Sequence, residues 1–500
     1  MTISADTLSY DFDEEGVGFG EPQGLQAPSH DGLSGAQKIA LTMVGLSLVA
    51  LVVQAFGGPL AGSWPGLAAS FGLLAVGSTL AFWLQHRGSA AGIKNDGIYF
   101  SSLLMRGGAA WIAGVGMTGL YVLLYWYPEY LGQPMNGGDP TGIIRVVDPL
   151  ARIMTGYPAS QWFLYGVLYT GAIFVFGMRM VMKYRNNRYQ QIRTASVAFF
   201  QLIFAWFLPN LLVRFRQPYM EFNGVWPLKQ DYLWPEKAAG QFLGSGAFGV
   251  FLLCFAVAMV IATPILTYFL GKRWYCSWVC GCGGLAETLG DPFRQLSSKS
   301  TRAWKLERWM IHSVLIAVLV VTASLWIDYK ATGNLYGSWS GPMRQWYGFS
   351  IGAVFSGVVG VGFYPLLGSR VWCRFGCPQA AILGLVQRFF SRFRITTNGG
   401  QCMSCGNCST YCEMGIDVRA YAEKGENIVR SSCVGCGICA AVCPRGVLKL
   451  ENGGTHADRY AGAETPITAF LDALEHNPKL VMPPATPVVE KNPSQCSAKE

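Results

Sequence analysis

Charged residues and histidines are scarce in this chain of 500 residues, and both shortages bear on function. Charged residues make up 13% of the sequence and hydrophobic residues 51%, whereas an ordinary soluble domain carries about 25% charged residues. No P-loop, dinucleotide-binding glycine fingerprint or catalytic triad occurs, which argues against nucleotide-dependent and hydrolytic enzymes. The composition therefore predicts an integral membrane protein with a soluble portion, and nothing in it indicates a nucleic-acid partner.

The first 37 residues contain seven acidic residues and no lysine or arginine. A secretory signal needs a basic start followed by an apolar core, so this segment is not one. We expect residues 1–37 to be an acidic, disordered cytoplasmic extension, with a docking arm for a basic partner as the alternative.

Eight apolar stretches are long enough to cross a membrane. The fold class predicted is an α-helical integral membrane protein with about eight transmembrane helices, divided into a four-helix region at 38–193 and a second at 194–395. A flexible tail is expected at 454–500, where proline is frequent and Cys496 is an incidental thiol. The predicted spans lie near 39–57, 64–85, 107–127, 160–180, 194–213, 242–270, 309–327 and 347–367.

The distribution of basic residues predicts the orientation. With a cytoplasmic N-terminus, the inner connections carry 20 lysines and arginines, against eight on the three later outer connections. The positive-inside rule therefore predicts a bacterial cytoplasmic (inner) membrane protein, with both termini and the cysteine-rich region after residue 396 in the cytoplasm. A reducing compartment keeps those thiols available for metals.

Two cysteine runs between residues 402 and 443 have the spacing C-x2-C-x2-C-x3-C, which is typical of bacterial ferredoxins with two [4Fe–4S] clusters. In such domains the fourth cysteine of each run binds the other cluster. We therefore expect a small α+β two-[4Fe–4S] ferredoxin-like domain at 396–453. The first predicted ligand set is Cys402, Cys405, Cys408 and Cys443, and the second is Cys433, Cys436, Cys439 and Cys412.

Neither structural zinc nor disulfides suit these eight cysteines. Zinc sites use paired C-x2-C motifs around one ion, and disulfides suit small secreted domains. The first run ends in Cys412-Glu413, where the second has Cys443-Pro444. A carboxylate beside one cluster should disfavour its reduced, more anionic form, so the two clusters are expected to differ in potential.

A second pattern repeats at an offset of 97 residues: Leu270-Gly-x-Arg followed by Cys276 and Cys280, then Leu367-Gly-x-Arg followed by Cys373 and Cys377. Each copy closes a two-span unit, which predicts two equivalent halves. If each C-x3-C pair lies on one helix, its thiols share a face. Four thiols would then converge on one site.

This thiol site has several open interpretations: a third iron–sulfur cluster, a copper centre, a redox-active dithiol pair, or ordinary buried cysteine. Cys282 could replace or supplement a ligand, because the first copy lacks the proline that follows Cys377. The nearby Arg273, Arg370 and Arg374 should lower the thiol pKa values. Cys254, inside the sixth span, is expected to be buried.

Paired cytoplasmic C-x3-C motifs followed by the ferredoxin-like cysteine runs resemble the NapH/NosR/CcoG group of polyferredoxin membrane proteins. The resemblance covers roughly residues 194–450 and is closest to NapH in layout. It implies electron transfer between a membrane donor, often quinol, and a partner redox protein. The first four spans are additional, and the flavin-binding and immunoglobulin-like domains of NosR and CcoG have no counterpart here.

We thus predict a membrane-bound iron–sulfur protein that relays electrons between a quinone pool or membrane partner and a redox partner, such as a ferredoxin or a respiratory or photosynthetic complex. The alternatives are a copper reductase or assembly factor, and a non-catalytic wiring subunit. Gln201, Asn210 and Arg214 are candidates for a quinone pocket or for helix capping. A haem between His86 and His312 is not expected.

Overall fold

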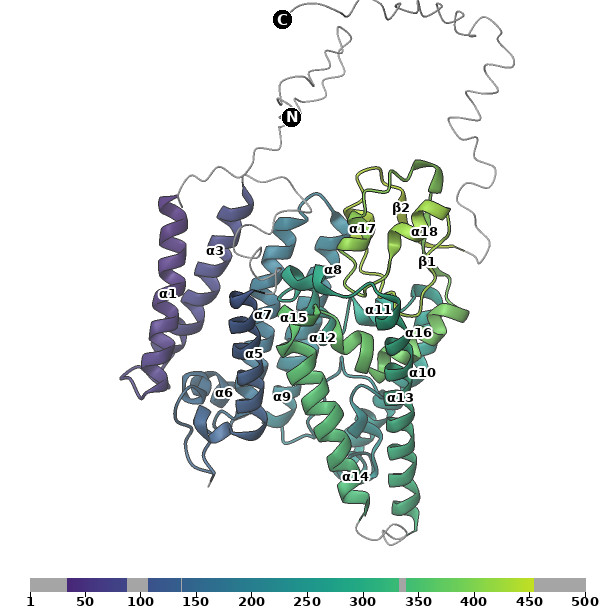
Figure 1. Cartoon of the computed structure of the whole chain (residues 1–500). Coiled ribbons are helices and arrows are strands. Elements are labelled where there is room, and N and C mark those ends of the chain that lie inside the picture. Colours follow the sequence, from purple (N-terminus) through teal and green to yellow (C-terminus); the bar gives the residue numbers. More distant parts are fainter. Residues whose placement is uncertain (1–33, 88–106, 136, 332–338, 454–500) are drawn as a thin grey trace, which may run out of the picture.

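The computed structural model describes residues 34–87, 107–135, 137–331 and 339–453 (Figure 1). Most of the predicted acidic extension and the whole predicted tail, including Cys496, lie outside these described residues. Long helices form a bundle, and the short helices and strands of the C-terminal region gather at one end of it (Figure 1).

Six of the predicted spans are helical segments long and apolar enough to cross a membrane. The third, α5 (Gly108–Trp126), contains a shorter apolar helix, Ala110–Trp126. The eighth is divided among α14 (Ser340–Tyr347), a π-helical stretch (Gly348–Gly362) and α15 (Tyr364–Leu367). A total of eight spans therefore stays a prediction. The first three segments are Gly35–Ala55 (α1), Trp64–Arg87, which ends in α3 (Leu73–Arg87), and Gln161–Lys183 (α7). The fourth, Arg188–Arg214, consists of α8 (Arg188–Phe200), a π-helical turn and α9 (Leu208–Arg214). The last two are Glu236–Leu270, which ends in α10 (Gly246–Leu270), and Thr301–Lys330 (α13).

Polar side chains mark where several of these helices begin. Ser34, Ser160, Asn187 and Ser300 each accept a hydrogen bond from a backbone N–H in the first turn of α1, α7, α8 and α13, respectively. Such caps satisfy donors that have no partner inside the helix, and each stabilises a helix by about 1 kcal/mol.

The repeated Leu-Gly-x-Arg motif ends a helix in the same way in both copies. Gly271 follows α10 with φ +74° and ψ 173°, and Gly368 follows α15 with φ +97° and ψ 167°. Glycine adopts positive φ without steric cost, so the chain can turn sharply at both places. The structure thus has equivalent turns at equivalent positions of the repeat.

The C-x3-C pairs do not lie on single helices, contrary to the sequence-based expectation. Cys276 ends α11 (Arg273–Cys276), and Cys280 caps α12 (Gly281–Glu287). Cys373 lies in a π-helical turn, and Cys377 caps α16 (Pro378–Phe389). In both copies the second cysteine therefore sits at a helix N-terminus.

The C-terminal region pairs two antiparallel strands, β1 (Phe393–Thr397) and β2 (Leu448–Asn452), in a register that joins Phe393 to Asn452 and Thr397 to Leu448. Three short α-helices lie between the strands: α17 (Asn407–Thr410), α18 (Val418–Lys424) and α19 (Ile438–Ala441). This is the α+β arrangement expected of the cysteine-rich region.

The C-terminal region shares one apolar core with the helix bundle. The largest buried apolar cluster includes Trp274 and Val318 from the bundle together with Ile416, Val434 and Leu448 from the C-terminal region. Burial of this kind stabilises a contact by roughly 25 cal/mol per Å² of apolar surface removed from water. The cysteine runs are therefore held against the bundle rather than attached by a free linker.

We predict that Gly368→Ala destabilises the protein by about 1–3 kcal/mol, because its backbone has a positive φ that alanine adopts only with strain. The new Cβ would also lie 2.4 Å from Ser297 Oγ. A lower melting temperature in detergent is the expected result. The control is Gly348→Ala, where φ is −59° and an added Cβ meets nothing within 4 Å among the described residues. Equal melting temperatures for the two variants would contradict this account.

Candidate metal centres

The structure gathers the eight cysteines of the C-terminal region into two groups of four. Each group lines its own small cavity. The first group, the solvent-facing set, is Cys402, Cys405, Cys408 and Cys443; the second, the helix-docked set, is Cys412, Cys433, Cys436 and Cys439. These are the groups predicted from the exchange of the fourth cysteine between the two runs.

Positive φ angles shape both cysteine loops. Ser404 and Gly406 flank the second cysteine of the first run with φ +54° and +76°, and Gly435 and Gly437 flank that of the second run with φ +60° and +75°. These left-handed residues coil each loop tightly. Three sulfurs of one short run can therefore face a single cavity.

The two sets differ in exposure. Cys405 is exposed, and its neighbour Met403 is 56% exposed. Cys433 and Cys439 are buried, at 8% and 7% exposure. The solvent-facing set therefore reaches the surface at Cys405, although its Cys408 is buried, whereas no cysteine of the helix-docked set is exposed.

Four side chains from the bundle hold the loop of the helix-docked set. They donate hydrogen bonds to four consecutive backbone carbonyls, those of residues 433–436, over distances of 2.7–3.0 Å. The donors come from α16, from the turn after α11 and from α8, so both copies of the repeat and a preceding helix take part. In order along the loop they are Gln387, Ser277, Tyr189 and Gln190.

The thiol quartet, defined as Cys276, Cys280, Cys373 and Cys377, is buried at 5–6% exposure and belongs to the core shared by the bundle and the C-terminal region. Among the described residues, no three cysteine, histidine or acidic side chains lie close enough together to hold a single metal ion.

Burial outweighs the arginines that were expected to favour thiolates. It raises the pKa of the Cys276 thiol to about 11 although Lys272 and Arg370 oppose the shift, and it also raises that of Cys373. Arg273 instead stacks on Phe393, and Arg374 pairs with Glu307. A metal cation would have to displace the thiol protons on binding.

Two further cysteines lie outside these groups. Cys282 is within hydrogen-bonding reach of Cys280 and Tyr169. Cys254 is exposed on α10, so its predicted burial was wrong. Cysteine is apolar enough to face lipid as well as protein, which is why an apolar span alone does not determine which way the side chain points.

Glu413, next to Cys412, is completely buried and does not act as an isolated negative charge. Its carboxylate lies 2.9 Å from Arg294 and 3.0 Å from Arg370. Burial alone would raise the pKa of Glu413, but the two guanidiniums hold it below its usual value. Arg294 in turn pairs with Asp291, which also pairs with Arg179 of α7. The expected effect of an unpaired carboxylate is therefore offset by neighbouring cations.

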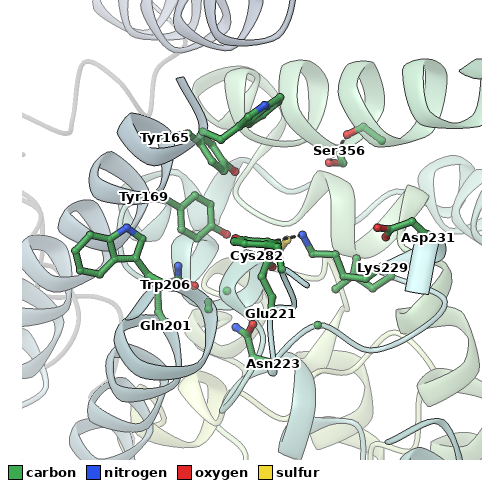
Figure 2. A pocket seen from close by; sticks show the side chains of 18 of the residues that line it. Tyr165, Tyr169, Gln201, Trp206, Glu221, Asn223, Lys229, Asp231, Cys282 and Ser356 are labelled. Carbon is green, nitrogen blue, oxygen red and sulfur yellow. Dashed lines mark hydrogen bonds and ion pairs between the residues drawn. The ribbon is translucent and has the colours of Figure 1, made fainter. Parts of the chain in front are cut away.

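A cavity of about 800 Å³ lies beside the thiol quartet, and Cys280 and Cys282 form part of its wall. Tyr165 and Tyr169 lie on one side of it and Lys229 on the other, with Cys282 between them (Figure 2). Ligand sites are typically concave, mostly apolar cavities of about 300–1,000 Å³ with a few polar groups. The cavity therefore has the size and composition of a binding site.

The additional N-terminal helices supply part of this cavity. Tyr125 comes from α5, and Trp162, Tyr165 and Tyr169 come from α7. The role of this region had no interpretation at sequence level. Pairs of tyrosines four residues apart, at 121 and 125 and at 165 and 169, place aromatic rings on one helix face and could have indicated it.

Two of the three polar residues singled out in the fifth span line the cavity. They are Gln201 and Asn210. Arg214 instead donates a hydrogen bond to the Arg152 carbonyl and serves a structural role. Glu221 and Lys229 form an ion pair in the wall of the cavity. They come from the connection between α9 and α10, and the sequence alone did not single out these two residues.

Comparisons with known proteins point to iron–sulfur chemistry. A family model described as a 4Fe-4S dicluster domain matches residues 401–448, and one described as a 4Fe-4S binding domain matches residues 252–300 and 349–396. The second model thus matches both copies of the repeat that carries the thiol quartet. The chain therefore contains ferredoxin-type 4Fe–4S domains.

Two relatives are similar over part of the chain. YccM of Escherichia coli (strain K12), whose name refers to electron transport, is 27% identical over 33% of this chain and 47% of its own length. The methylamine utilization ferredoxin-type protein MauN of Paracoccus denitrificans (strain Pd 1222) is 31% identical over 35% of this chain and 62% of its own length. The chain thus spans about half to three-fifths of these relatives. No solved structure matches significantly.

We predict that Gln387→Ala loosens the attachment of the cysteine loop. The change removes hydrogen bonds to the Lys272 N–H and to the carbonyls of Arg430 and Cys433, all buried or partly buried. Leaving such groups without partners should cost about 2–3 kcal/mol. Hydrogen exchange of residues 430–436 should accelerate about 30- to 150-fold, since 1.4 kcal/mol is a factor of ten.

The matched control is Gln241→Ala, an exposed glutamine in the segment before α10. It should leave the exchange of residues 430–436 unchanged. Unchanged exchange in the Gln387 variant would mean that this side chain does not hold the loop.

Proposed function

We propose that this membrane iron–sulfur electron-transport protein holds two [4Fe–4S] clusters, one in each four-cysteine set, and relays electrons between a quinone in its cavity and a soluble redox partner. The observation that carries the proposal is the continuous arrangement of the sites. The cavity borders the thiol quartet, Arg370 links the quartet to the residue next to Cys412, and the solvent-facing set is exposed.

The donor groups fit this cofactor. Each small cavity is lined by four cysteines, and thiolate sulfur is the usual ligand of [4Fe–4S] clusters. When bound, such clusters accept and return electrons at potentials that the surrounding charge, hydrogen bonds and solvent exposure adjust. The protein contributes position, burial and charge.

The thiol quartet is best interpreted as a third iron–sulfur site. The match to a 4Fe-4S binding domain covers both copies of the repeat. Thiolate sulfur is the usual ligand of such clusters, and Cys282 lines the cavity in the same region. We infer that the quartet stands between the cavity and the helix-docked set.

The cavity suits a quinone because aromatic rings and polar donors share its wall. Trp206 and Trp372 line it, and the indole N–H of each is buried without an acceptor among the described residues. Buried donors of this kind normally have a partner, and a quinone carbonyl oxygen could accept from either. Tyrosine and tryptophan rings would pack against the quinone ring.

The predicted orientation completes the proposal. If the ferredoxin-like region is cytoplasmic, as the basic residues predict, the soluble partner is a cytoplasmic redox protein such as a ferredoxin or a complex subunit. The outer connection that carries Glu221 and Lys229 would then form the end of the cavity remote from the cytoplasm.

The cluster content is directly testable. Cys402→Ala should remove the cluster of the solvent-facing set, and Cys433→Ala that of the helix-docked set, because each cluster needs four thiolate ligands. The signal of one centre should disappear from the EPR spectrum in each variant, and the iron lost should be equal in the two. Cys254→Ala, at an exposed position on α10, should keep the full iron content. Unchanged iron in both cluster variants would contradict the ligand assignment.

The quinone site is tested by reoxidation of the reduced protein. Anaerobic protein in lipid is reduced, freed of excess reductant and mixed with a soluble quinone analogue while the iron–sulfur EPR signal is followed. Prompt reoxidation is expected for the wild type. Gly352→Leu, which adds a side chain to the cavity wall, should slow it at least about tenfold, as expected for loss of about 1.4 kcal/mol of binding.

Two further variants complete this experiment. Cys373→Ser should abolish reoxidation by the quinone analogue, because it removes one thiol of the quartet. Gly341→Leu, in α14 where an added Cβ meets nothing within 4 Å among the described residues, should behave as wild type. If the wild-type signal persists after quinone addition, the quinone is not the partner.

A further inference from the structure

One buried guanidinium contacts both copies of the repeat and the ferredoxin-like region. Arg370 Nη1 lies 3.3 Å from the carbonyl oxygen of Cys276 and 3.7 Å from Cys373 Sγ. Its Nη2 lies 2.5 Å from Glu287 Oε1 and 3.0 Å from Glu413 Oε1. Arg370 therefore touches the thiol quartet on one side and the residue next to Cys412 on the other.

Glu413 is the residue of the ferredoxin-like region that pairs with Arg370. Its side chain is fully buried, as is that of Arg370. Arg294 binds its second carboxylate oxygen at 2.9 Å, so the carboxylate is fixed between two guanidiniums. Glu413 also lines the small cavity of the helix-docked set. Its negative charge thus lies directly beside that set.

Charges in such a place act strongly on their neighbours. Water and salt, which screen charges at the surface, do not reach fully buried groups, so the effective dielectric constant is low. Reduction of an iron–sulfur cluster adds one negative charge. A nearby positive charge stabilises the added electron and a nearby negative charge opposes it.

We propose that Arg370 and Glu413 are positioning residues that jointly set the reduction potential of the helix-docked set and hold it against the thiol quartet. Arg370 raises that potential and Glu413 lowers it. The solvent-facing set lies outside this pair and is affected much less. This inference rests on the proposed function, because it presumes that the helix-docked set binds a cluster.

The Arg370–Glu413 pair gives the two four-cysteine sets different reduction potentials. Both sets have four cysteines and coiled loops, but the ion pair adjoins only the helix-docked set. At a distance the charges of Arg370 and Glu413 nearly cancel, whereas a cluster close to the pair is affected by each charge separately. Removing either charge should therefore shift the potential of the helix-docked set, in a direction that depends on which charge is removed. Because Arg370 also touches Cys373, its loss should shift a cluster in the thiol quartet in the same direction.

The experiment is an EPR-monitored redox titration of purified, cluster-loaded protein, which needs no partner and no turnover. Glu413→Gln should raise the midpoint potential of the helix-docked centre, which is the centre whose signal Cys433→Ala removes, because Arg370 and Arg294 then act without the carboxylate. Arg370→Gln should lower the midpoint of the same centre. Arg370→Lys keeps the charge and should shift the potential less than Arg370→Gln does.

The control is Glu423→Gln, an exposed carboxylate of the same region whose side chain is 41% exposed. Its loss should leave the midpoints of all the iron–sulfur centres unchanged, because solvent screens it. If the pair had only a structural role, Glu413→Gln and Arg370→Gln would both loosen the packing, and the midpoint potential would shift in the same direction in the two variants. Opposite shifts are therefore specific to the electrostatic role.

Shifts in the same direction, or unmoved midpoints with both signals intact, would overturn the inference and leave the proposed function standing. If Arg370→Gln loses a cluster, the other two variants decide the outcome. A higher midpoint potential in Glu413→Gln together with a small change of midpoint in Arg370→Lys supports the inference. Any other pattern overturns it. Absence of two iron–sulfur signals from the wild type would instead contradict the proposed function.

Discussion

The position of the ferredoxin-like region depends on the hydrogen bonds that attach one cysteine loop to the helix bundle. The carbonyls of residues 433–436 accept hydrogen bonds from four side chains of the helix bundle. Buried carbonyls must find donors, and here all four donors come from the bundle. The helix-docked set therefore cannot move independently of the helices. This attachment is what makes one set enclosed and the other solvent-facing, although their local sequences are nearly alike.

The repeated half-units explain where that attachment comes from. Gly271 and Gly368 turn the chain in the same way after α10 and α15. Each turn leads to a buried cysteine and then to a second cysteine at a helix N-terminus. Ser277 of the first copy and Gln387 of the second both reach the loop at residues 433–436. A duplicated unit thus provides both the thiol quartet and the platform for the ferredoxin-like region.

The features that could be predicted from the sequence follow local chemical rules. Cysteine spacing predicted two groups of four that the structure gathers around separate cavities, and the offset of 97 residues predicted equivalent halves. Hydropathy predicted the six long apolar helices, because a membrane span needs a continuous run of apolar residues.

The features that could not be predicted depend on contacts between distant segments. Glu413 looked like an isolated negative charge, but arginines 119 and 43 residues before it form ion pairs with it. The arginines near the quartet were expected to favour thiolates, yet burial dominates and two of the three bind elsewhere. The cavity combines side chains from α5 and α7 with the connection between α9 and α10, and no single stretch of sequence contains that combination. Tertiary packing decides such cases.

The central claim is that two four-cysteine sets hold clusters in series between the helix bundle and the solvent. An anaerobic cryo-electron microscopy map of the protein in lipid would test it most directly. The account predicts cluster-sized density at both sets, with the buried one joined to residues 433–436 against the helices. Disulfides between these cysteines, or single metal ions in place of clusters, would contradict it.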